Sequence, residues 1–315
     1  MSQLLSASTR ETFGNTLVEL GRENPNIVVL GGDLNVSTFA HLFAKEFPDR
    51  FFDFGPAEQN ILSVAAGLAA SGKIPFCSTF AVFGTGRAFD QIRVGIAHSN
   101  LNVKLVCTHA GLLTGEDGVS AQAIEDLALM CSLPTMTVVA PADGPETALA
   151  VRAAADTPGP FYIRLYRPAT PVIHSQEYSF KIGQAELLRQ GSDLTIIACG
   201  SMVSTAVEAS VILEEKGIST RVVNMHTLKP TDSNAIENAA RETGAIVTAE
   251  EHYIHGGLAS VVAGVTSQGF PVPIEFVGVT QYAESGKPAE LLEKYGLTSQ
   301  DIVSSALKVL ERKSK

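Results

Sequence analysis

The segment FFDFGPAEQNILSVAAGLAASGKIPFCSTF, residues 51–80, decides the fold. Two β-rich runs, Phe51–Gly55 and Ile74–Phe80, flank a stretch of helical pattern, Gln59–Ser71. A strand, a helix and a second strand in this order form the βαβ unit of a parallel sheet. Ligands of such sheets bind at the carboxyl ends of the strands, so the residues that follow each strand are the first candidates for a site.

The same alternation continues through the rest of the chain. Further strands are predicted at Asn26–Gly31, Val103–His109, Thr135–Ala140 and Phe161–Leu165, and helices at Thr38–Glu46, Gly86–Ser99, Gln122–Cys131 and Gly144–Asp156. Beyond a linker, Tyr166–Ser192, with a polar, hairpin-like stretch at Lys181–Asp193, strands are predicted at Leu194–Gly200, Thr220–Asn224, Ala245–Glu250 and Pro273–Val277. The pattern predicts an α/β fold of two doubly wound, mostly parallel-sheet domains, residues 1–180 and 181–315.

Charge and composition exclude several classes of partner. The 315 residues include 23 Lys and Arg against 33 Asp and Glu, a net charge of −10, so neither nucleic acid nor a membrane surface is an expected partner. Lys73 is the only charge between Glu58 and Arg87, but glycine, proline and polar residues interrupt this stretch too often for a membrane span. Its low charge instead suggests a surface that is buried against another chain.

The ends of the chain and its cysteines indicate a cytoplasmic protein. Residues Met1 to Arg10 show no basic segment followed by an apolar run, so no secretory signal is predicted. The four cysteines (Cys77, Cys107, Cys131, Cys199) lie far apart without CxxC spacing. We expect reduced, buried thiols and no metal site.

Common catalytic motifs are missing. The GTG at Gly84–Gly86 lacks the third glycine of a dinucleotide fingerprint, and the sequence contains no phosphate loop of the GxxxxGK[ST] type, HExxH, GxSxG or EF-hand pattern. The chemistry must therefore come from polar residues at the strand ends.

These strand-end residues each allow two interpretations. Glu58 begins a helix, where an acid commonly interacts with the helix dipole, but in apolar surroundings its pKa would rise and it could donate a proton near neutrality. Phe80 and Phe83 have the spacing of core aromatics or of a cofactor platform. His109 and Asp117 lie in a glycine-rich loop, where they could form turns or a site.

Ten motifs in a fixed order resemble one family. STRETFG (8–14), GGDLNVS (31–37), GPAEQN (55–60), STFAVF (78–83), THAGLLTGEDG (108–118), PADG (141–144) and YRP (166–168) resemble the pyrimidine-binding domain of transketolase. IACGS (197–201), NMHTLKPTD (224–232) and TAEEHYIHGG (248–257) resemble its C-terminal domain. The resemblance covers essentially the whole chain.

The resemblance implies thiamine diphosphate as cofactor. Glu58 matches the glutamate that protonates the aminopyrimidine ring, and Phe80 and Phe83 match aromatics that hold this ring by stacking. Asp33 and Leu34 fall in the family's cofactor-proximal loop. Gly86 stands where the family often has a further aromatic residue.

The resemblance also implies a sugar-phosphate substrate. Arg10, Ser37, His109 and Arg167 match the family's clamp for the terminal phosphate, and Asp117 matches a carboxylate that binds a substrate hydroxyl. Ala121 departs from the histidine or glutamine of some relatives. Arg164 is expected to be structural, and His252 and His255 to lie at an interface or on the surface.

Half of such an active site is missing from the sequence. The family binds the diphosphate and Mg²⁺ through GDG and a later asparagine, whereas GGD (31–33), EDG (116–118) and ADG (142–144) here lack that combination. The resemblance therefore implies the C-terminal subunit of a split transketolase, a hetero-oligomer whose N-terminal subunit holds Mg²⁺ and the diphosphate, with a heterotetramer as the expected assembly. The implied reaction transfers a two-carbon ketol unit from a ketose phosphate to an aldose acceptor, as in pentose phosphate metabolism.

Three alternatives stay open. The β subunit of a 2-oxo-acid dehydrogenase decarboxylase has the same domain order, but the clamp residues weigh against it. Deoxyxylulose-phosphate synthase shares the GxAEQ pattern, but normally keeps its domains in one chain. A non-catalytic scaffold is disfavoured because Glu58 and both clamp arginines are present together.

Overall fold

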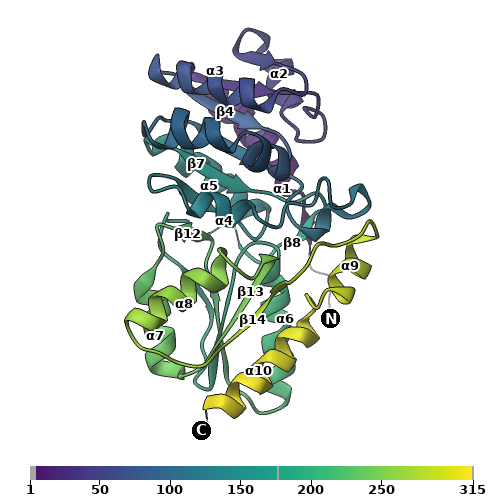
Figure 1. Ribbon diagram of the computed structural model, residues 1–315, viewed down its shortest axis with the longest axis vertical. Helices are drawn as coiled ribbons and strands as arrows, with labels where there is room; N and C mark the ends of the chain where they lie inside the picture. The colour runs from purple at the N-terminus through teal and green to yellow at the C-terminus, as the bar shows by residue number, and fades with distance from the viewer. Residues whose placement is uncertain (1–4, 176, 314–315) are drawn as a thin grey trace.

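The structure, a computed structural model, describes residues 5–175 and 177–313, and two α/β halves lie end to end in it (Figure 1). Residues 1–4, on which part of the expectation about the N-terminus falls, lie outside the described residues. The predicted α/β class with two mostly parallel sheets is confirmed.

A seven-stranded sheet forms the centre of the first half, in the order β12-β6-β7-β5-β4-β2-β3. Its strands are β2 (Ile27–Gly31), β3 (Phe51–Asp53), β4 (Ile74–Ser78), β5 (Lys104–Cys107), β6 (Thr137–Val139), β7 (Phe161–Arg164) and β12 (Thr227–Lys229). The βαβ unit predicted at residues 51–80 is present, with β3 and β4 pairing in parallel with opposite edges of β2. Only β12 runs antiparallel to its neighbour in this sheet.

Helices cover both faces of this sheet. They are α1 (Thr9–Glu23), α2 (His41–Glu46), α3 (Glu58–Ala70), α4 (Asp126–Cys131) and α5 (Gly144–Asp156), with short 3₁₀ turns η1 (Pro48–Arg50) and η4 (Leu112–Asp117). The ends of α1 and α5 follow ordinary capping chemistry, since Ser8 accepts from the Glu11 N–H and Asp143 from the Glu146 N–H.

The helix predicted at Gly86–Ser99 is wrong in both start and geometry. Two π-helical segments, η2 (Phe83–Arg87) and η3 (Gln91–Ala97), replace it. The wider turn shows in bonds from the amides of His98 and Leu101 to the carbonyls five residues earlier. Gly84 lies so close to Cys107 that a Cβ there would be 2.8 Å from its Sγ. This close approach explains why the position holds a glycine.

A five-stranded sheet forms the second half, in the order β14-β13-β10-β11-β9. Its strands are β9 (Glu186–Arg189), β10 (Leu194–Ala198), β11 (Thr220–Asn224), β13 (Ile246–Tyr253) and β14 (Ile274–Val279). Helices α7 (Ser233–Thr243) and α8 (Leu258–Gln268) lie on one face, and α6 (Met202–Glu215) and α10 (Ser299–Lys313) on the other, with α9 (Pro288–Lys294) near the first half (Figure 1).

The hairpin-like stretch expected at Lys181–Asp193 is not a hairpin. It contains one strand, β9, which pairs antiparallel with β11 rather than with a second strand of its own segment. Near the N-terminus a two-stranded ribbon pairs β1 (Ser6–Ala7) with β8 (Thr170–Pro171) and ties the start of the chain to the linker.

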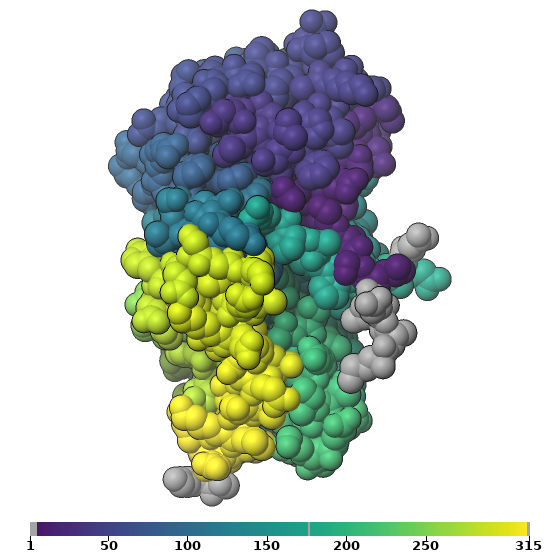
Figure 2. Space-filling view, turned by 90° about the vertical axis from the view of Figure 1, so that its right-hand side faces the viewer, coloured from purple at the N-terminus to yellow at the C-terminus, as the bar shows by residue number. Residues whose placement is uncertain are grey.

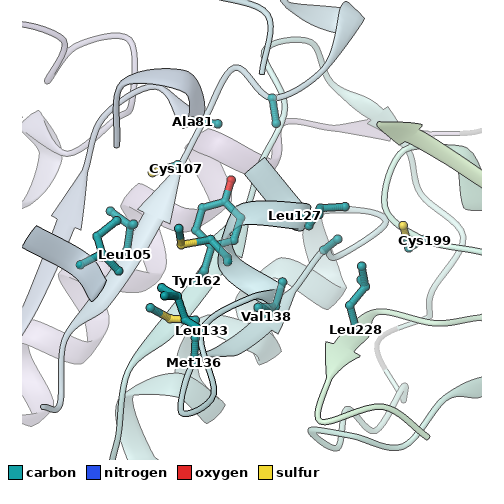
Figure 3. Close-up of a cluster of buried hydrophobic side chains, with 14 of the residues drawn as sticks. Ala81, Leu105, Cys107, Leu127, Leu133, Met136, Val138, Tyr162, Cys199 and Leu228 are labelled. Atoms are coloured by element: carbon teal, nitrogen blue, oxygen red, sulfur yellow. The ribbon is translucent and has the colours of Figure 1, made fainter. Parts of the chain in front are cut away.

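The two halves share one hydrophobic core. Leu127 and Val138 of the first half belong to the same buried cluster as Cys199 and Leu228 of the second (Figure 3). Strand β12 lies beyond residue 181 in the sequence, yet it completes the sheet of the first half. The relative position of the halves is therefore set by packing and by backbone pairing together.

Three of the four cysteines agree with the expectation of buried thiols. All four are free thiols, with Cys131 half-buried and the others buried. Among residues 5–175 and 177–313, every helix is too short or too polar to cross a lipid bilayer.

Candidate active site

The predicted site residues gather at the carboxyl edge of the seven-stranded sheet. Glu58 follows β3 as the first residue of α3, Phe80 follows β4, His109 follows β5 and Arg167 follows β7. Because these strands are parallel, their ends reach the same edge.

Glu58 and the two phenylalanines form a continuous series of contacts. Glu58 is only 4% exposed, and Arg87 Nη1 donates to its Oε2 at 2.7 Å. The Arg87 guanidinium carbon lies 4.6 Å from the centre of the Phe83 ring. Phe83 in turn stacks with Phe80 at 5.8 Å between ring centres. The expectation of charge-free, apolar surroundings for Glu58 is therefore wrong, because Arg87 folds back over the aromatic platform.

His109 continues this series on the other side of Phe80. The two rings stack with centres 3.6 Å apart and planes 18° apart. The His109 backbone has φ +57°, a left-handed conformation that non-glycine residues seldom adopt. Burial, and the positive charges of Arg10 and Arg167, lower the pKa of His109 to about 3. Its imidazole is thus neutral at physiological pH.

Two arginines face this neutral ring. Arg10 Nη1 donates to the Ser37 carbonyl at 2.6 Å, so Ser37 meets Arg10 through its backbone. Arg167 Nη1 donates to the Thr114 carbonyl at 2.6 Å. Burial lowers the pKa of Arg10, and the positive charge of Arg167 lowers it further. Such a pair of cations beside a neutral ring favours an anionic ligand.

Asp117 lies beside the same arginine. Its Oδ1 is 3.7 Å from Arg167 Nη1, and Glu116 Oε2 is 3.0 Å from that nitrogen. The structure thus brings together Arg10, the Ser37 backbone, His109, Asp117 and Arg167. Their placement fits the predicted clamp, while their roles remain predictions.

Asp33 and Leu34 lie in the turn-rich segment after β2. Leu34 accepts from the Thr38 N–H at 3.0 Å. Asp33 is exposed, and among the described residues no hydrogen bond or ion pair joins it to the cluster. Gly86 faces open space, whereas Ala121 is 5% exposed. The structure leaves the two loop residues at the margin of the site.

Sequence reasoning missed two contacts. Arg87 was considered only as the end of a low-charge stretch. It lies 29 residues after Glu58, a separation that spans one βα unit and so can bring the two side chains together. Glu251, in β13, accepts from the Leu113 N–H at 2.6 Å and so reaches the loop that carries Asp117. The TAEEHYIHGG motif contained this signal, but only its histidines were weighed.

The remaining predicted residues lie where expected. Arg164 is buried and its Nε donates to Asp126 Oδ2 at 2.9 Å, so it is structural. His252 is buried between the halves, where its Nε2 accepts from the Ala128 N–H at 3.3 Å. His255 is exposed.

A buried His–carboxylate cluster lies at the junction, away from the site. His174 Nε2 is 2.7 Å from Glu186 Oε2, and its Nδ1 is 3.0 Å from Asp143 Oδ2. Glu146 completes a group of three possible metal ligands within 4.8 Å of one another. Burial lowers the pKa of His174, but hydrogen bonds that Asp143 and Glu186 accept from its ring, together with the charge of Glu146, raise it to about 10. With the imidazole protonated, the cluster is an ion-pair network.

Two protein-family models match successive parts of the chain. A family model described as "Transketolase, pyrimidine binding domain" matches residues 6–172, and one described as "Transketolase, C-terminal domain" matches residues 183–302.

Similar curated proteins fall into two lengths. A Methanocaldococcus jannaschii protein named "Putative transketolase C-terminal section" is 44% identical, over 96% of this chain and 96% of its own length. The Clostridium sp. "6-deoxy-6-sulfo-D-fructose transketolase subunit SqwH" is 40% identical, over 97% of this chain and 95% of its own length. Mouse transketolase-like protein 2 is 43% identical over 95% of this chain, which spans about half of that relative, 48%.

Solved structures show the same pattern. The chain in "Split gene transketolase, inactive beta4 tetramer" is 51% identical, with a TM-score of 0.92 and coverage of 98% of this chain and 99% of that one. Transketolase from Leishmania mexicana is 26% identical with a TM-score of 0.82, over 98% of this chain but only 46% of the longer protein.

Proposed function

The chain belongs to the transketolase family, and on that premise we propose that it is the C-terminal subunit of a thiamine-diphosphate-dependent transketolase that acts with a separate N-terminal subunit. The observation that carries the proposal is the unbroken series of contacts from Glu58 through Arg87, Phe83 and Phe80 to His109. It joins a buried carboxylate, two stacked aromatic rings and a histidine flanked by positive charge.

The geometry around Arg87 supports an aminopyrimidine ligand. The guanidinium is planar, donates N–H to Glu58 and lies over the Phe83 ring. An aminopyrimidine ring is likewise planar and bears N–H donors, so the same carboxylate and aromatic face suit it. Arg87 is half-exposed, with 49% of its side chain accessible, and can move aside. The residues present therefore fit the pyrimidine half of the cofactor.

Each group of the chain has a distinct task in this proposal. Thiamine diphosphate, when bound, supplies the electron sink for the carbon–carbon bond that is broken and remade. Glu58 holds and exchanges a proton at the edge of the pyrimidine, and Phe80 and Phe83 orient the ring. Arg10, Ser37, His109 and Arg167 bind the terminal anion of a sugar substrate, and Asp117 accepts a hydrogen bond from one of its hydroxyls.

The partner supplies what this sequence lacks. The GDG and asparagine pattern for diphosphate and Mg²⁺ is missing from the chain, so we assign those ligands to the N-terminal subunit, in a cytoplasmic heterotetramer. The exposed residues Gln59, Asn60, Ser63 and Gly67 give α3 an uncharged outer face that suits contact with another chain.

The clamp also separates the alternatives. The positive charges of Arg10 and Arg167, both of which act on His109, favour a substrate with a terminal phosphate over a 2-oxo acid without one, which argues against the dehydrogenase β subunit. The Clostridium relative is named for a sulfo sugar, so the assay compares ketose donors that end in phosphate with donors that end in sulfonate.

Reconstitution tests the proposal. The purified chain and the N-terminal subunit are titrated with thiamine diphosphate and Mg²⁺ by calorimetry, separately and together, and ketol transfer is assayed in parallel. We expect tight binding and turnover only with both subunits. Full turnover by this chain alone would refute the need for a partner.

Glu58→Ala provides the residue-level control. We expect it to assemble normally by size-exclusion chromatography and to lose at least about 10²-fold in ketol transfer, the usual contribution of a positioned acid or base. Activity that survives in an assembled variant would show that the assignment of Glu58 is wrong.

A further inference from the structure

Glu251 carries a side chain of the second half into the loop that forms the clamp. It lies in β13 and is 2% exposed. Its Oε1 accepts from the Leu113 N–H at 2.6 Å, and its Oε2 accepts from the Ser201 hydroxyl at 2.6 Å. Because both of its oxygens accept hydrogen bonds, this buried carboxylate has a fixed position and can hold the loop in place.

The loop is shaped around this carboxylate. Gly111 has φ +72°, and a Cβ added there would clash with Glu251 Oε1. Only glycine meets both conditions, the left-handed backbone and the close approach. The Gly111 N–H also donates to the Ala123 carbonyl at 2.7 Å. The start of the loop is therefore held between the two halves.

One residue connects Leu113 to the clamp. The Thr114 hydroxyl donates to the His109 carbonyl at 2.7 Å, and Arg167 Nη1 donates to the Thr114 carbonyl at 2.6 Å. A shift of the Leu113 amide would therefore move the partner of both His109 and Arg167.

The second half also supports the far end of the loop. The Gln122 amide donates to the carbonyls of Gly115 and Glu284, at 3.1 and 3.2 Å. A Cβ on Gly115 would lie 3.0 Å from Pro288 Cγ, at the start of α9. In Figure 2 the yellow-green surface of the second half lies against the blue-teal surface of the first.

We propose that Glu251 is a positioning residue, which holds the Gly111–Thr114 turn so that His109 and Arg167 keep the spacing required by the terminal anion of the substrate. The proposal rests on the proposed transketolase function. It gives the C-terminal half a part in substrate binding that acts through the loop of the first half.

The adjacent residue Glu250 offers a matched control. It is also a fully buried glutamate in β13, and it accepts from the Leu258 and Ala259 N–H groups at 2.8 Å at the start of α8. Burial raises the pKa of both glutamates to about 7. Loss of either side chain should destabilise the protein, but only Glu251 contacts the clamp loop.

Steady-state kinetics of the two-subunit enzyme form the first test. For Glu251→Ala we expect the KM of a phosphorylated ketose donor to rise on the order of tenfold while kcat changes by about twofold or less. Glu251→Gln keeps an acceptor for the Leu113 N–H and should restore most of the KM. Glu250→Ala should lower the melting temperature and leave the KM unchanged. An unchanged KM in Glu251→Ala, or an equal rise in Glu250→Ala, would overturn the proposal.

Hydrogen exchange at the Leu113 amide gives a readout that does not depend on catalysis. We expect faster exchange in Glu251→Ala than in the wild type or in Glu250→Ala. If the wild-type pair shows no ketol transfer, the proposed function fails, whereas equal protection in all variants overturns the positioning role alone. Should Glu251→Ala not fold, Ser201→Ala replaces it, with a smaller rise in KM expected and no rise counting against the proposal.

Discussion

Arg87 packs over the Phe83 ring and forms an ion pair with Glu58. The first contact covers the face on which the cofactor ring would stack, whereas the second stabilises the free chain. The Arg87 guanidinium must leave Phe83 before a pyrimidine ring can stack there. For Arg87→Ala we therefore expect thiamine diphosphate to bind the assembled enzyme more tightly than it binds the wild type. The free chain should lose about 1 kcal/mol of stability, since the pair is half-exposed on the arginine side.

Calorimetric titration and thermal denaturation check both expectations on the same variant. Weaker cofactor binding by Arg87→Ala would mean that the guanidinium helps to bind the cofactor rather than competing with it. Arg93→Ala, which removes an exposed pair with Asp90, is the control for loss of charge.

The residues at strand ends could be predicted, but their contacts could not. Glu58, Phe80 and His109 each follow a recognisable strand, and a parallel sheet brings strand ends to one edge. Arg87 was missed because its position over Phe83 depends on a π-helical turn that has no clear sequence signal. Glu251 was missed because its contact with Leu113 joins residues 138 apart in different sheets.

The linker between the sheets contains a buried ion-pair cluster around His174. This cluster should make the free energy of unfolding fall as the pH becomes alkaline. His174 lies between Asp143 and Glu186, close to Glu146 and stacked on Tyr178. Its pKa of about 10 exceeds the unfolded value of about 6.5. The stabilisation is therefore complete below pH about 6.5 and is lost as pH rises to about 10.

Melting temperatures of the wild type and His174→Gln between pH 6 and 10 test this expectation. The difference should be largest at pH 6 and should shrink towards pH 10. His226→Gln is the control, because burial lowers the pKa of His226 to about 4. Its effect should change only below about pH 7.5, as the unfolded imidazole gains its proton, and should stay constant from there to pH 10. A constant difference for His174→Gln would contradict the assignment.

Two elements with regular hydrophobic patterns were predicted to the residue, whereas the helix expected at Gln122–Cys131 begins only at Asp126. Gly144–Asp156 and Thr220–Asn224 have the bounds expected from the sequence. The π-helical segments were taken for one regular helix. The pattern of apolar residues there does not distinguish hydrogen bonds between residues four apart, as in an α-helix, from bonds between residues five apart, as in a π-helix. Strand β9 was taken for a hairpin because its partner, β11, lies some 30 residues further along the chain.

At the scale of the whole molecule, the shared core predicts that the two halves unfold together. Leu228 in β12 is 1% exposed and belongs to the cluster that spans both halves (Figure 3). Leu228→Ala should cost about 2–5 kcal/mol, as for other buried leucines. Differential scanning calorimetry should show one transition in both proteins, shifted to lower temperature in the variant. Two transitions, of which only one moves, would show that the halves are independent.

The two-sheet architecture could be predicted from the alternation of strands and helices. The position of β12, which comes from the second half of the sequence but joins the sheet of the first half, could not. Thr227–Lys229 has only three residues, followed by a proline, and would ordinarily be taken for a loop. It forms a strand because it pairs with the otherwise unpaired edge of β6, which lies nearly 90 residues earlier in the sequence.

Strand β12 also limits where this protein can be divided. A gene cut between the two family domains would leave β6 at the rim of its sheet with unpaired backbone groups, and such rims recruit strands from other molecules and aggregate. A fragment that keeps the whole clamp would still lack this protecting strand. Cuts that separate β12 from β6 are therefore expected to give fragments that aggregate.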